Sequence, residues 1–586
     1  MNAVLGIKCG PQHDTGAAVV YENKGRLACV AISEERLSRD KQCRMFPERS
    51  IKACLHGAGL RLEDIDLVCL DKLGPDTHTL DHRSINSIPT SIWQEPESDF
   101  LKSLGDTPVM IVNHHMAHAA TAFCVHDMDD AACLVIDGTG SDYPLSESPH
   151  RLIEMSSPQS DESIPLKYYE RRAETQSIIK GTRSAKGQIH LTRKSVSTRS
   201  GCGHFYSFFT RQALAFGHLQ EGKSMGLAAW GDPSIAARLP EIPNDAFQGI
   251  DTLMLDYLKE IEFQYSKRPQ HVPATDEQYA AFAYWMQATL KQAVIHLARL
   301  SLEQCDSRNL CMAGGVALNV VNNRFVLDTL GSEQLLDRMF VQPASSDSGM
   351  PLGAALYGYY IIGNGTLPFQ KNLVYLGPPL NQLDSEALML ENGAFRSSQL
   401  SKDVADLLME GKIVGWLQGR SEYGPRALGA RSILCWPRPK DMKDHLNLRI
   451  KHREPFRPFA PIISETRMNE VFDVDFPVPY MLFNTQIRSE FLDRIPAVAH
   501  VDGSGRLQTV SSQRTPQLHD LLDEIQRRDQ VGVLLNTSFN DAGEPIVETA
   551  ADAIDCYHRT GLDALVVGDT ILVRGKEVKP SNIGNH

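Results

Sequence analysis

The sequence predicts an α/β protein of two domains. Its 586 residues exceed what one hydrophobic core usually organises, so we expect two cores. Apolar strands that end in glycine-rich or acidic loops recur along the chain, and helical segments separate them, an alternation that is typical of α/β domains. A proline- and glycine-containing stretch at 375–380 marks the boundary, which gives domains 1–378 and 379–586.

The first domain is predicted to open with a β-meander. Three short apolar strands separated by polar turns favour it, at 4–7, 16–21 and 27–33. Further along, the apolar run 131–136 ends in Asp137-Gly138-Thr139-Gly140, and the run 310–313 ends in Gly314-Gly315. Strands that deliver an aspartate or a double glycine into a tight loop are how nucleotide-binding α/β domains hold phosphates and metal ions.

The remaining elements follow from local pattern. Apolar residues near helical spacing predict a helix over 279–305. The polar stretch 143–200 is expected to be an elaborated hairpin inserted in the first domain, with a surface or substrate-gating role. In the second domain we predict a helix after 380, a strand at 413–417, and a strand at 531–535 that delivers Asn536 to Asn540 into a loop.

Composition excludes several classes of function. The chain has 59 basic and 72 acidic residues and a formal net charge of -13, which opposes nonspecific attraction to nucleic acid or to an anionic membrane. No apolar segment approaches the roughly 18 residues that span a bilayer, and no secretory signal is recognisable, so we expect a cytoplasmic protein. The 12 cysteines lack zinc-type spacing, and Cys202 has no nearby base that would activate it as a nucleophile.

Two histidines suggest a metal site. His114 and His118 lie four residues apart in a segment of helical propensity, which places both imidazoles on one helix face. Carboxylates from Asp137 and Asp347, each in a glycine-flanked loop after a strand, could complete the shell. Imidazole with carboxylate suits iron, zinc or manganese, so the ligand types leave the metal open. The alternative is a pair of ordinary helix histidines.

His13 and Asp14 occupy the first hairpin turn. An imidazole there could take a proton from an incoming hydroxyl as a general base, since its ordinary pKa suits proton transfer at neutral pH. The alternative is a His-Asp pair that caps the turn.

The segments 419–432 and 451–459 concentrate arginine and lysine in an otherwise acidic chain. Arginine forks match phosphate oxygens bidentately, and glycine or proline turns let the backbone approach an anion. Phe456 and Phe459 lie among the charges and would partly dry the site, which strengthens its electrostatics. The pattern predicts a pocket for a small, multiply anionic phosphate ester, with a solvated basic surface as the alternative.

Together these motifs resemble the NodU/CmcH-type O-carbamoyltransferases, the family that modifies nodulation factors, cephamycins and aminoglycosides. The resemblance runs over nearly the whole chain, through both the histidine pair and the arginine-rich segments. It also includes the motifs Glu34-Glu35-Arg36, Glu221-Gly222-Lys223, Gly314-Gly315-Val316-Ala317-Leu318-Asn319 and Asn536-Thr537-Ser538-Phe539-Asn540. The sequence departs from the family in the loop 138–142, where many relatives have a glutamate, and in the 143–200 excursion.

The resemblance implies an amino-terminal actin-like ATPase domain, similar to the threonylcarbamoyl-transfer enzymes, and a YrdC-like α/β carboxyl-terminal domain. The second domain would use carbamoyl phosphate and ATP, with Mg2+, to make carbamoyl adenylate. The first, which carries Fe2+ in this family, would pass the carbamoyl group to a hydroxyl of a specialised metabolite or sugar. We expect these small molecules as partners, without nucleic acid or a membrane; a homodimer is left open.

The resemblance also assigns a role to each candidate residue. The metal ligands are His114, His118, Asp137 and Asp347, and the base is His13. First-domain nucleotide contacts are expected from Gly138, Lys223, Gly314, Gly315 and Asn319. Carbamoyl phosphate and ATP contacts in the second domain are expected from Arg426, Lys451, Arg453, Arg457, Arg506, Asn536 and Ser538.

Two other functions remain as alternatives. Transfer of threonylcarbamoyl to tRNA is disfavoured, because the chain is acidic and shows no RNA-sized basic surface. A non-catalytic nucleotide-binding relative is disfavoured because none of the metal or phosphate side chains is missing.

Overall fold

The computed structural model describes residues 1–10, 13–73, 79–87, 93–138, 140–141, 173–197, 201–239, 241–242 and 267–575.

Six strands build the first sheet. The sheet has the order β3-β2-β1-β4-β6-β5. Its strands are β1 (Ala3–Cys9), β2 (Gly16–Asn23), β3 (Arg26–Ser33), β4 (Leu67–Lys72), β5 (His82–Ser84) and β6 (Val109–Val112). β1 to β3 form the predicted antiparallel meander, while β4 runs parallel to β1 and β6 parallel to β4.

The second sheet repeats this plan. Its order is β11-β10-β7-β8-β9, and its strands are β7 (Asp130–Ile136), β8 (Gln176–Arg183), β9 (Ile189–Ser197), β10 (Asn309–Ala313) and β11 (Arg338–Val341). β7 to β9 are antiparallel, and β10 and β11 continue parallel to β7. The described part of the predicted excursion, 173–197, contains the β8-β9 hairpin; 142–172 and 198–200 lie outside the described residues.

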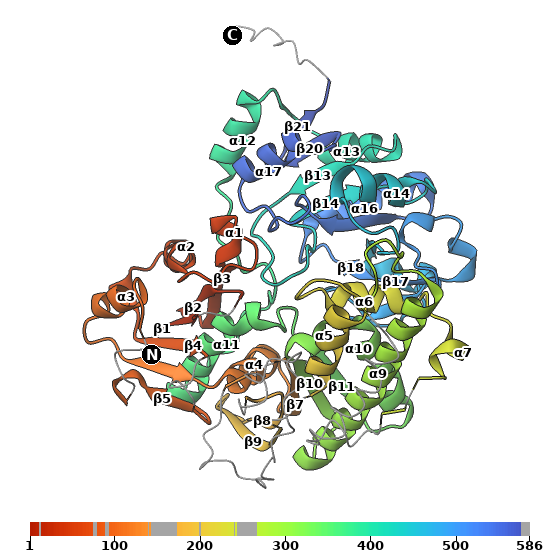
Figure 1. The fold of residues 1–586 in the computed structure, drawn as a ribbon. Helices are drawn as coiled ribbons and strands as arrows, with labels where there is room; N and C mark the ends of the chain where they lie inside the picture. Colours follow the sequence, from red (N-terminus) through yellow and green to blue (C-terminus); the bar gives the residue numbers. More distant parts are fainter. Residues whose placement is uncertain are drawn as a thin grey trace, which may run out of the picture.

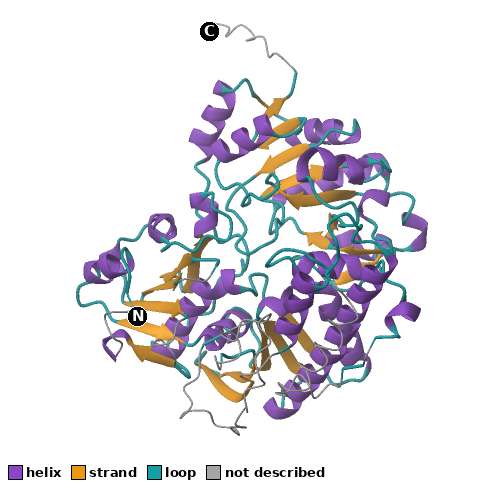
Figure 2. Cartoon of the chain, viewed as in Figure 1, coloured by secondary structure: helices purple, strands orange, loops and turns teal. Residues whose placement is uncertain are grey.

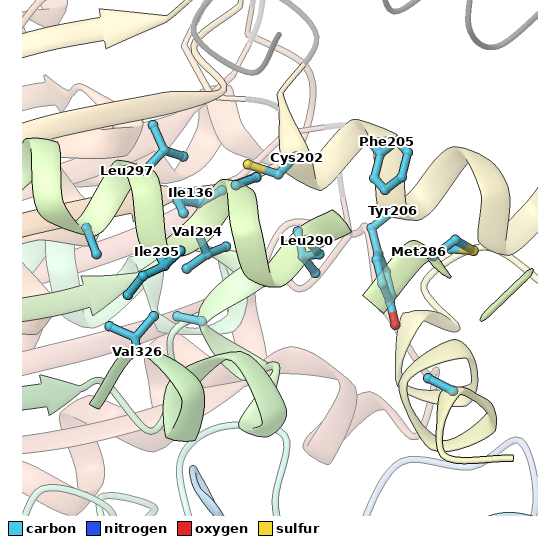
Figure 3. Packing of buried hydrophobic residues seen from close by; sticks show 14 of the residues in the cluster. Ile136, Cys202, Phe205, Tyr206, Met286, Leu290, Val294, Ile295, Leu297 and Val326 are labelled. Atoms are coloured by element: carbon cyan, nitrogen blue, oxygen red, sulfur yellow. The ribbon is translucent and has the colours of Figure 1, made fainter. Parts of the chain in front are cut away.

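Helices pack on and between these two sheets (Figure 1, Figure 2). They are α1 (Glu34–Ser38), α2 (Glu48–Ala58), α3 (Glu97–Ser103), α4 (His114–Phe123), α5 (Cys202–Gln212), α6 (Glu221–Ala228), α7 (Pro233–Ala236), α9 (Glu277–Cys305), α10 (Val320–Ser332) and α11 (Met350–Tyr357). α2 and α3 pack on one face of the first sheet, and α4 and α11 lie between the two sheets. α5, α9 and α10 cover the far face of the second sheet, where Leu290, Val294 and Ile136 pack together (Figure 3).

The two central helices touch backbone to backbone. A Cβ on Gly353 of α11 would lie 2.3 Å from the carbonyl oxygen of Ala117 in α4, so only glycine fits this position. Every residue of α4 is buried. Tight packing on all sides therefore holds the helix that carries the histidine pair.

An eight-stranded mixed sheet organises the second domain, in the order β12-β21-β20-β13-β14-β19-β15-β18. Its strands are β12 (Phe395–Arg396), β13 (Val414–Leu417), β14 (Arg431–Cys435), β15 (Ala460–Ser464), β18 (Gln508–Val510), β19 (Val533–Ser538), β20 (Ala564–Val567) and β21 (Thr570–Val573). A small ladder joins β16 (Asn484–Gln486) to β17 (Ser504–Arg506). The predicted loop at 536–540 is wrong in its first part, because Asn536 to Ser538 continue β19 and pair with β14.

Helices cover both faces of this sheet. They are α12 (Gln382–Glu391), α13 (Leu400–Met409), α14 (Met442–Leu446), α15 (Met468–Val471), α16 (Pro516–Asp529) and α17 (Ala550–Arg559). α13 and α16 pack on one face, and α12, α14 and α17 on the other. Among the helices in the described ranges, none combines the length and apolarity needed to cross a membrane.

Buried and partly buried polar contacts join the upper and lower parts of the molecule in Figure 1. Arg36 of α1 donates to the backbone oxygen of Glu422 at 3.2 Å and ion-pairs with Glu548 at 3.7 Å. Arg420 donates to the backbone oxygen of Cys29 at 2.8 Å, and His500 contacts the backbone oxygen of Gly226 at 2.9 Å. These contacts hold the second domain against β3, α1 and α6 of the first.

Candidate metal centre and anion site

Two imidazoles and two carboxylates converge in the first domain. His114 and His118 come from the first turns of α4, Asp137 follows β7, and Asp347 follows β11. One ligand atom from each lies within 4.8 Å of all the others, and all four residues are buried. The centre therefore forms where the carboxyl ends of the parallel strands meet, the usual ligand position in α/β sheets.

Neighbouring polar groups orient these four side chains. Asp71, at the end of β4, faces His114 Nδ1 with its two carboxylate oxygens at 3.0 and 3.1 Å. This leaves His114 Nε2 pointing toward Asp137 and Asp347, at 3.5 Å from each carboxylate. Lys8 forms a buried ion pair with Asp347. An oriented imidazole backed by a carboxylate is typical of metal-binding histidines.

Orphaned nitrogens indicate that the four residues fit a metal ion. His114 Nε2 and both ring nitrogens of His118 are buried and have no hydrogen-bond partner in the part of the chain that the structure describes, which is costly unless another ligand satisfies them. Burial and the neighbouring His114 lower the pKa of His118 to about 3, so its imidazole is neutral, as a metal ligand must be. Burial and Asp347 raise the pKa of Asp137, but the histidines hold it below its ordinary value. Imidazole with ionised carboxylate is a donor set for iron, zinc or manganese.

His13 lies within the electrostatic reach of this centre. Its Nδ1 is 3.0 Å from Asp14 Oδ2, and its ring centroid is 6.0 Å from that of His218. Burial lowers the pKa of His13, but the bond to Asp14 and the Asp347 carboxylate raise it above its ordinary value. The structure thus gives the predicted base an orienting carboxylate.

The glycine candidates adjoin the metal centre. Gly315 donates its N–H to Asp137 Oδ1 at 2.9 Å. Gly314 has a φ of +90°, and a Cβ there would lie 2.2 Å from the carbonyl oxygen of Ile136, so the loop requires glycine. A Cβ placed on Gly138 would have no atom of the described residues within 4 Å.

The other two first-domain candidates, Asn319 and Lys223, bond to side chains outside the metal centre. Asn319 caps α10 and shares hydrogen bonds with Gln287 at 2.9 and 3.3 Å. Lys223 of α6 donates to Glu454 of the second domain at 2.7 Å. Its ammonium group is therefore engaged at the arginine-rich segment.

Four arginines of the second domain form a cluster that we call the arginine cluster: Arg426, Arg453, Arg457 and Arg506. Burial and Arg457 lower the pKa of Arg426 to about 10 and that of Arg453 to about 9. Burial and the other three guanidinium groups lower the pKa of Arg506. Their charges therefore repel one another in a partly dry site.

Little negative charge in the described part of the chain neutralises this cluster. Among the described residues, the only carboxylate that ion-pairs with it is Glu454, 3.9 Å from Arg457 and shared with Lys223. Nε of Arg426 and Nε of Arg506 are buried and have no hydrogen-bond partner within the described ranges. A site with excess, partly buried positive charge and unused donors is suited to a multiply charged anion.

The remaining second-domain candidates lie on β19 or reach it. Lys451 donates to the backbone oxygens of Ser538 and Asn540 at 2.6 and 2.9 Å. Its burial and the nearby Arg453 lower its pKa well below the ordinary value. Asn536 donates to Ala427 and Gln508, and its buried Oδ1 has no partner among the residues that the structure describes.

Sequence reasoning missed Asp71, Lys8 and Glu422, which support these sites. Asp71 ends the apolar run Leu67–Lys72 much as Asp137 follows the run 131–136, so the strand-then-aspartate pattern could have indicated it. Lys8 is the single charge in the buried strand Ala3–Cys9. No local pattern indicates that Glu422 accepts hydrogen bonds from the backbone of Leu428, Ala430 and Arg431, because these bonds form only when the loop after Glu422 folds back.

Comparison with known proteins identifies the family of this chain. The chain matches the carbamoyltransferase N-terminus over 3–91 and 90–356 and the carbamoyltransferase C-terminus over 405–574. It is 32% identical to nodulation protein NolNO of Sinorhizobium fredii, across 97% of this chain and 80% of that protein. It is 29% identical to nodulation protein U of the same organism, across 94% of this chain and 96% of that protein.

Among solved structures it is similar to full-length HypF in a phosphate- and nucleotide-bound form. That match has 13% identity and a TM-score of 0.31, and it covers 63% of this chain and 56% of that one. The family assignment instead depends on the sequence matches, which extend through both parts of the chain. The chain therefore belongs to the carbamoyltransferase family, as an enzyme of that family.

Proposed function

We propose that this protein is an ATP-dependent O-carbamoyltransferase that makes carbamoyl adenylate from carbamoyl phosphate and ATP, then transfers the carbamoyl group to a hydroxyl. The observation that carries the proposal is the arginine cluster, whose partly buried positive charge exceeds what Glu454 can neutralise. Both donors are multiply anionic phosphate compounds, as such a site requires. Forming carbamoyl adenylate from them takes up one water and releases phosphate and pyrophosphate.

In the donor site, the arginines would hold the phosphate groups and neutralise the departing one. Their environment is partly dry, so each charge-assisted hydrogen bond is stronger than in water. Lys451 fixes the turn after β19 through its two backbone contacts, and Ser538 and Asn540 are proposed to line the donor site with the cluster. We propose ATP as the nucleotide, with Mg2+ bound to its phosphates.

In the transfer site, His114, His118, Asp137 and Asp347 would hold a divalent metal, for which the family resemblance favours Fe2+. When bound, the metal would polarise the carbamoyl carbonyl or the adenylate phosphate. Asp71 and Lys8 orient two of the ligands. His13, oriented by Asp14, would take the proton of the acceptor hydroxyl, whose oxygen then bonds to the carbamoyl carbon as AMP leaves.

The division of labour follows the proposed domains, 1–378 and 379–586. The repeated sheet order of the first domain supports an actin-like fold, and the mixed sheet of the second is offered as the YrdC-like part. Specialised metabolites or sugars are the proposed acceptors.

The proposal is tested by incubating the protein with ATP, carbamoyl phosphate and a panel of hydroxylated metabolites and reading mass gains by mass spectrometry. We expect a carbamoylated product that requires both donors. A product formed without ATP, or one that needs threonine and bicarbonate in place of carbamoyl phosphate, would contradict it.

A further inference from the structure

One carboxylate oxygen binds three backbone N–H groups at the end of the loop 424–429, which carries Arg426. Glu422 Oε1 accepts hydrogen bonds from the backbone N–H groups of Leu428 at 2.7 Å, Ala430 at 2.7 Å and Arg431 at 3.1 Å. Glu422 is only 3% exposed. Three N–H groups directed at one buried carboxylate oxygen are charge-assisted bonds, stronger than neutral ones.

Other side chains hold the carbonyl groups of the same loop. Asn536 donates to Ala427 at 3.1 Å, Gln508 to Leu428 at 2.6 Å, and Trp416 to Gly429 at 3.0 Å. The backbone of the loop is therefore fixed from both its amide and its carbonyl sides. These bonds determine where the Arg426 side chain leaves the backbone.

Such support has a physical reason. The guanidinium groups of Arg457 and Arg506 lie close enough to Arg426 to perturb it electrostatically, and no carboxylate pairs with it among the described residues. Before an anion binds, this repulsion pushes Arg426 away from the cluster. A loop of high mobility would yield to that push, so a rigid loop is needed to keep the cluster assembled.

We infer that Glu422 is a positioning residue for the donor phosphate: it holds the 424–429 loop so that Arg426 stays in the arginine cluster. The inference rests on the proposed function, in which that cluster binds carbamoyl phosphate. Glu422 is itself held from the first domain, because Arg36 donates to its backbone oxygen at 3.2 Å. Glu422 does not touch the donor; it acts through Arg426.

Binding of carbamoyl phosphate, and of inorganic phosphate as a stable probe, tests the inference in Glu422→Ala and Glu422→Gln. Asp529→Ala is the matched control, because Asp529 is a buried carboxylate of the same domain that accepts from the N–H groups of Val531 and Gly532 at 2.8 and 2.9 Å. We expect Glu422→Ala to weaken binding about 10- to 100-fold, and Glu422→Gln about fivefold. Asp529→Ala should lower stability comparably and leave binding unchanged.

A double variant separates positioning from general stability. Because Glu422 acts through Arg426, Glu422→Ala should weaken binding less than about twofold further once Arg426→Ala is present. Hydrogen exchange of the Leu428, Ala430 and Arg431 amides gives a second readout, and it should accelerate in Glu422→Gln even if Glu422→Ala does not fold.

Each outcome decides the matter. Additive losses in the double variant, or wild-type exchange and affinity in Glu422→Gln, would overturn the inference while leaving the proposed function intact. A wild-type protein that binds neither phosphate nor carbamoyl phosphate would overturn the proposed function, and the inference with it.

Discussion

Replacing Arg426 with methionine should stabilise the unliganded protein and weaken phosphate binding at the same time. Burial and Arg457 lower the pKa of Arg426 to about 10. Relative to the ordinary arginine value this is a penalty of about 3 kcal/mol on the charged form, because a tenfold change in acidity corresponds to about 1.4 kcal/mol. Solvent reaches part of the side chain, so we expect Arg426→Met to raise the free energy of unfolding by about 1–3 kcal/mol.

Urea unfolding, with and without inorganic phosphate, measures both effects. Phosphate at 100 times its dissociation constant should stabilise the wild-type protein by about 2.7 kcal/mol and the variant by much less. Arg308→Met is the matched control, since Arg308 is exposed and ion-pairs with Asp337 outside the cluster. Because solvent screens an exposed ion pair, that control should change the stability little and keep the full phosphate effect.

The reasoning would be refuted by a less stable Arg426→Met protein in the absence of anion. It would equally be refuted by a variant that gains the same stability from phosphate as the wild type. Either result would mean that the arginine cluster is satisfied without an anion.

Three further perturbations test the metal centre and its loop. Asp71→Asn should lower metal affinity about 10- to 100-fold by releasing the orientation of His114, measured by equilibrium dialysis with metal analysis, and unchanged affinity would contradict this. Gly314→Ala should lower the free energy of unfolding in urea by about 2–4 kcal/mol, because its φ is positive and the new Cβ would clash with the carbonyl oxygen of Ile136. Gly138→Ala should lower it by less than about 1 kcal/mol. Equal losses would contradict the claim that the loop requires glycine at Gly314. After a chelator has removed the bound metal and Mg2+ has been added back, the protein should still form carbamoyl adenylate, detected by mass spectrometry, but should transfer no carbamoyl group. Transfer at the original rate would contradict a role of the metal centre in transfer.

Elements with strong local patterns could be predicted from the sequence. The meander β1 to β3 and the helix α4 follow from alternation and from apolar residues, which are properties of short segments. The four ligand candidates were predictable for a related reason: each follows a strand or begins a helix, where backbone geometry presents side chains at a sheet edge. Their convergence in the structure agrees with that expectation.

Contacts between distant segments could not be predicted in this way. Lys8 and Asp347 are 339 positions apart, and nothing local to either residue indicates their ion pair. The same holds for Asp71, whose partner lies on another strand-helix unit. The predicted loop at 536–540 was wrong at its start because polar side chains suggested a turn, whereas pairing with β14 extends the strand through Ser538.

Product analysis of two variants tests the division of labour most directly. His118→Ala and Lys451→Ala would each be incubated with ATP, carbamoyl phosphate and an accepted hydroxyl compound, after circular dichroism has shown that both are folded. We predict that His118→Ala accumulates carbamoyl adenylate without carbamoylated product and that Lys451→Ala forms neither. A folded His118→Ala protein that makes no carbamoyl adenylate would contradict the assignment of activation and transfer to separate sites.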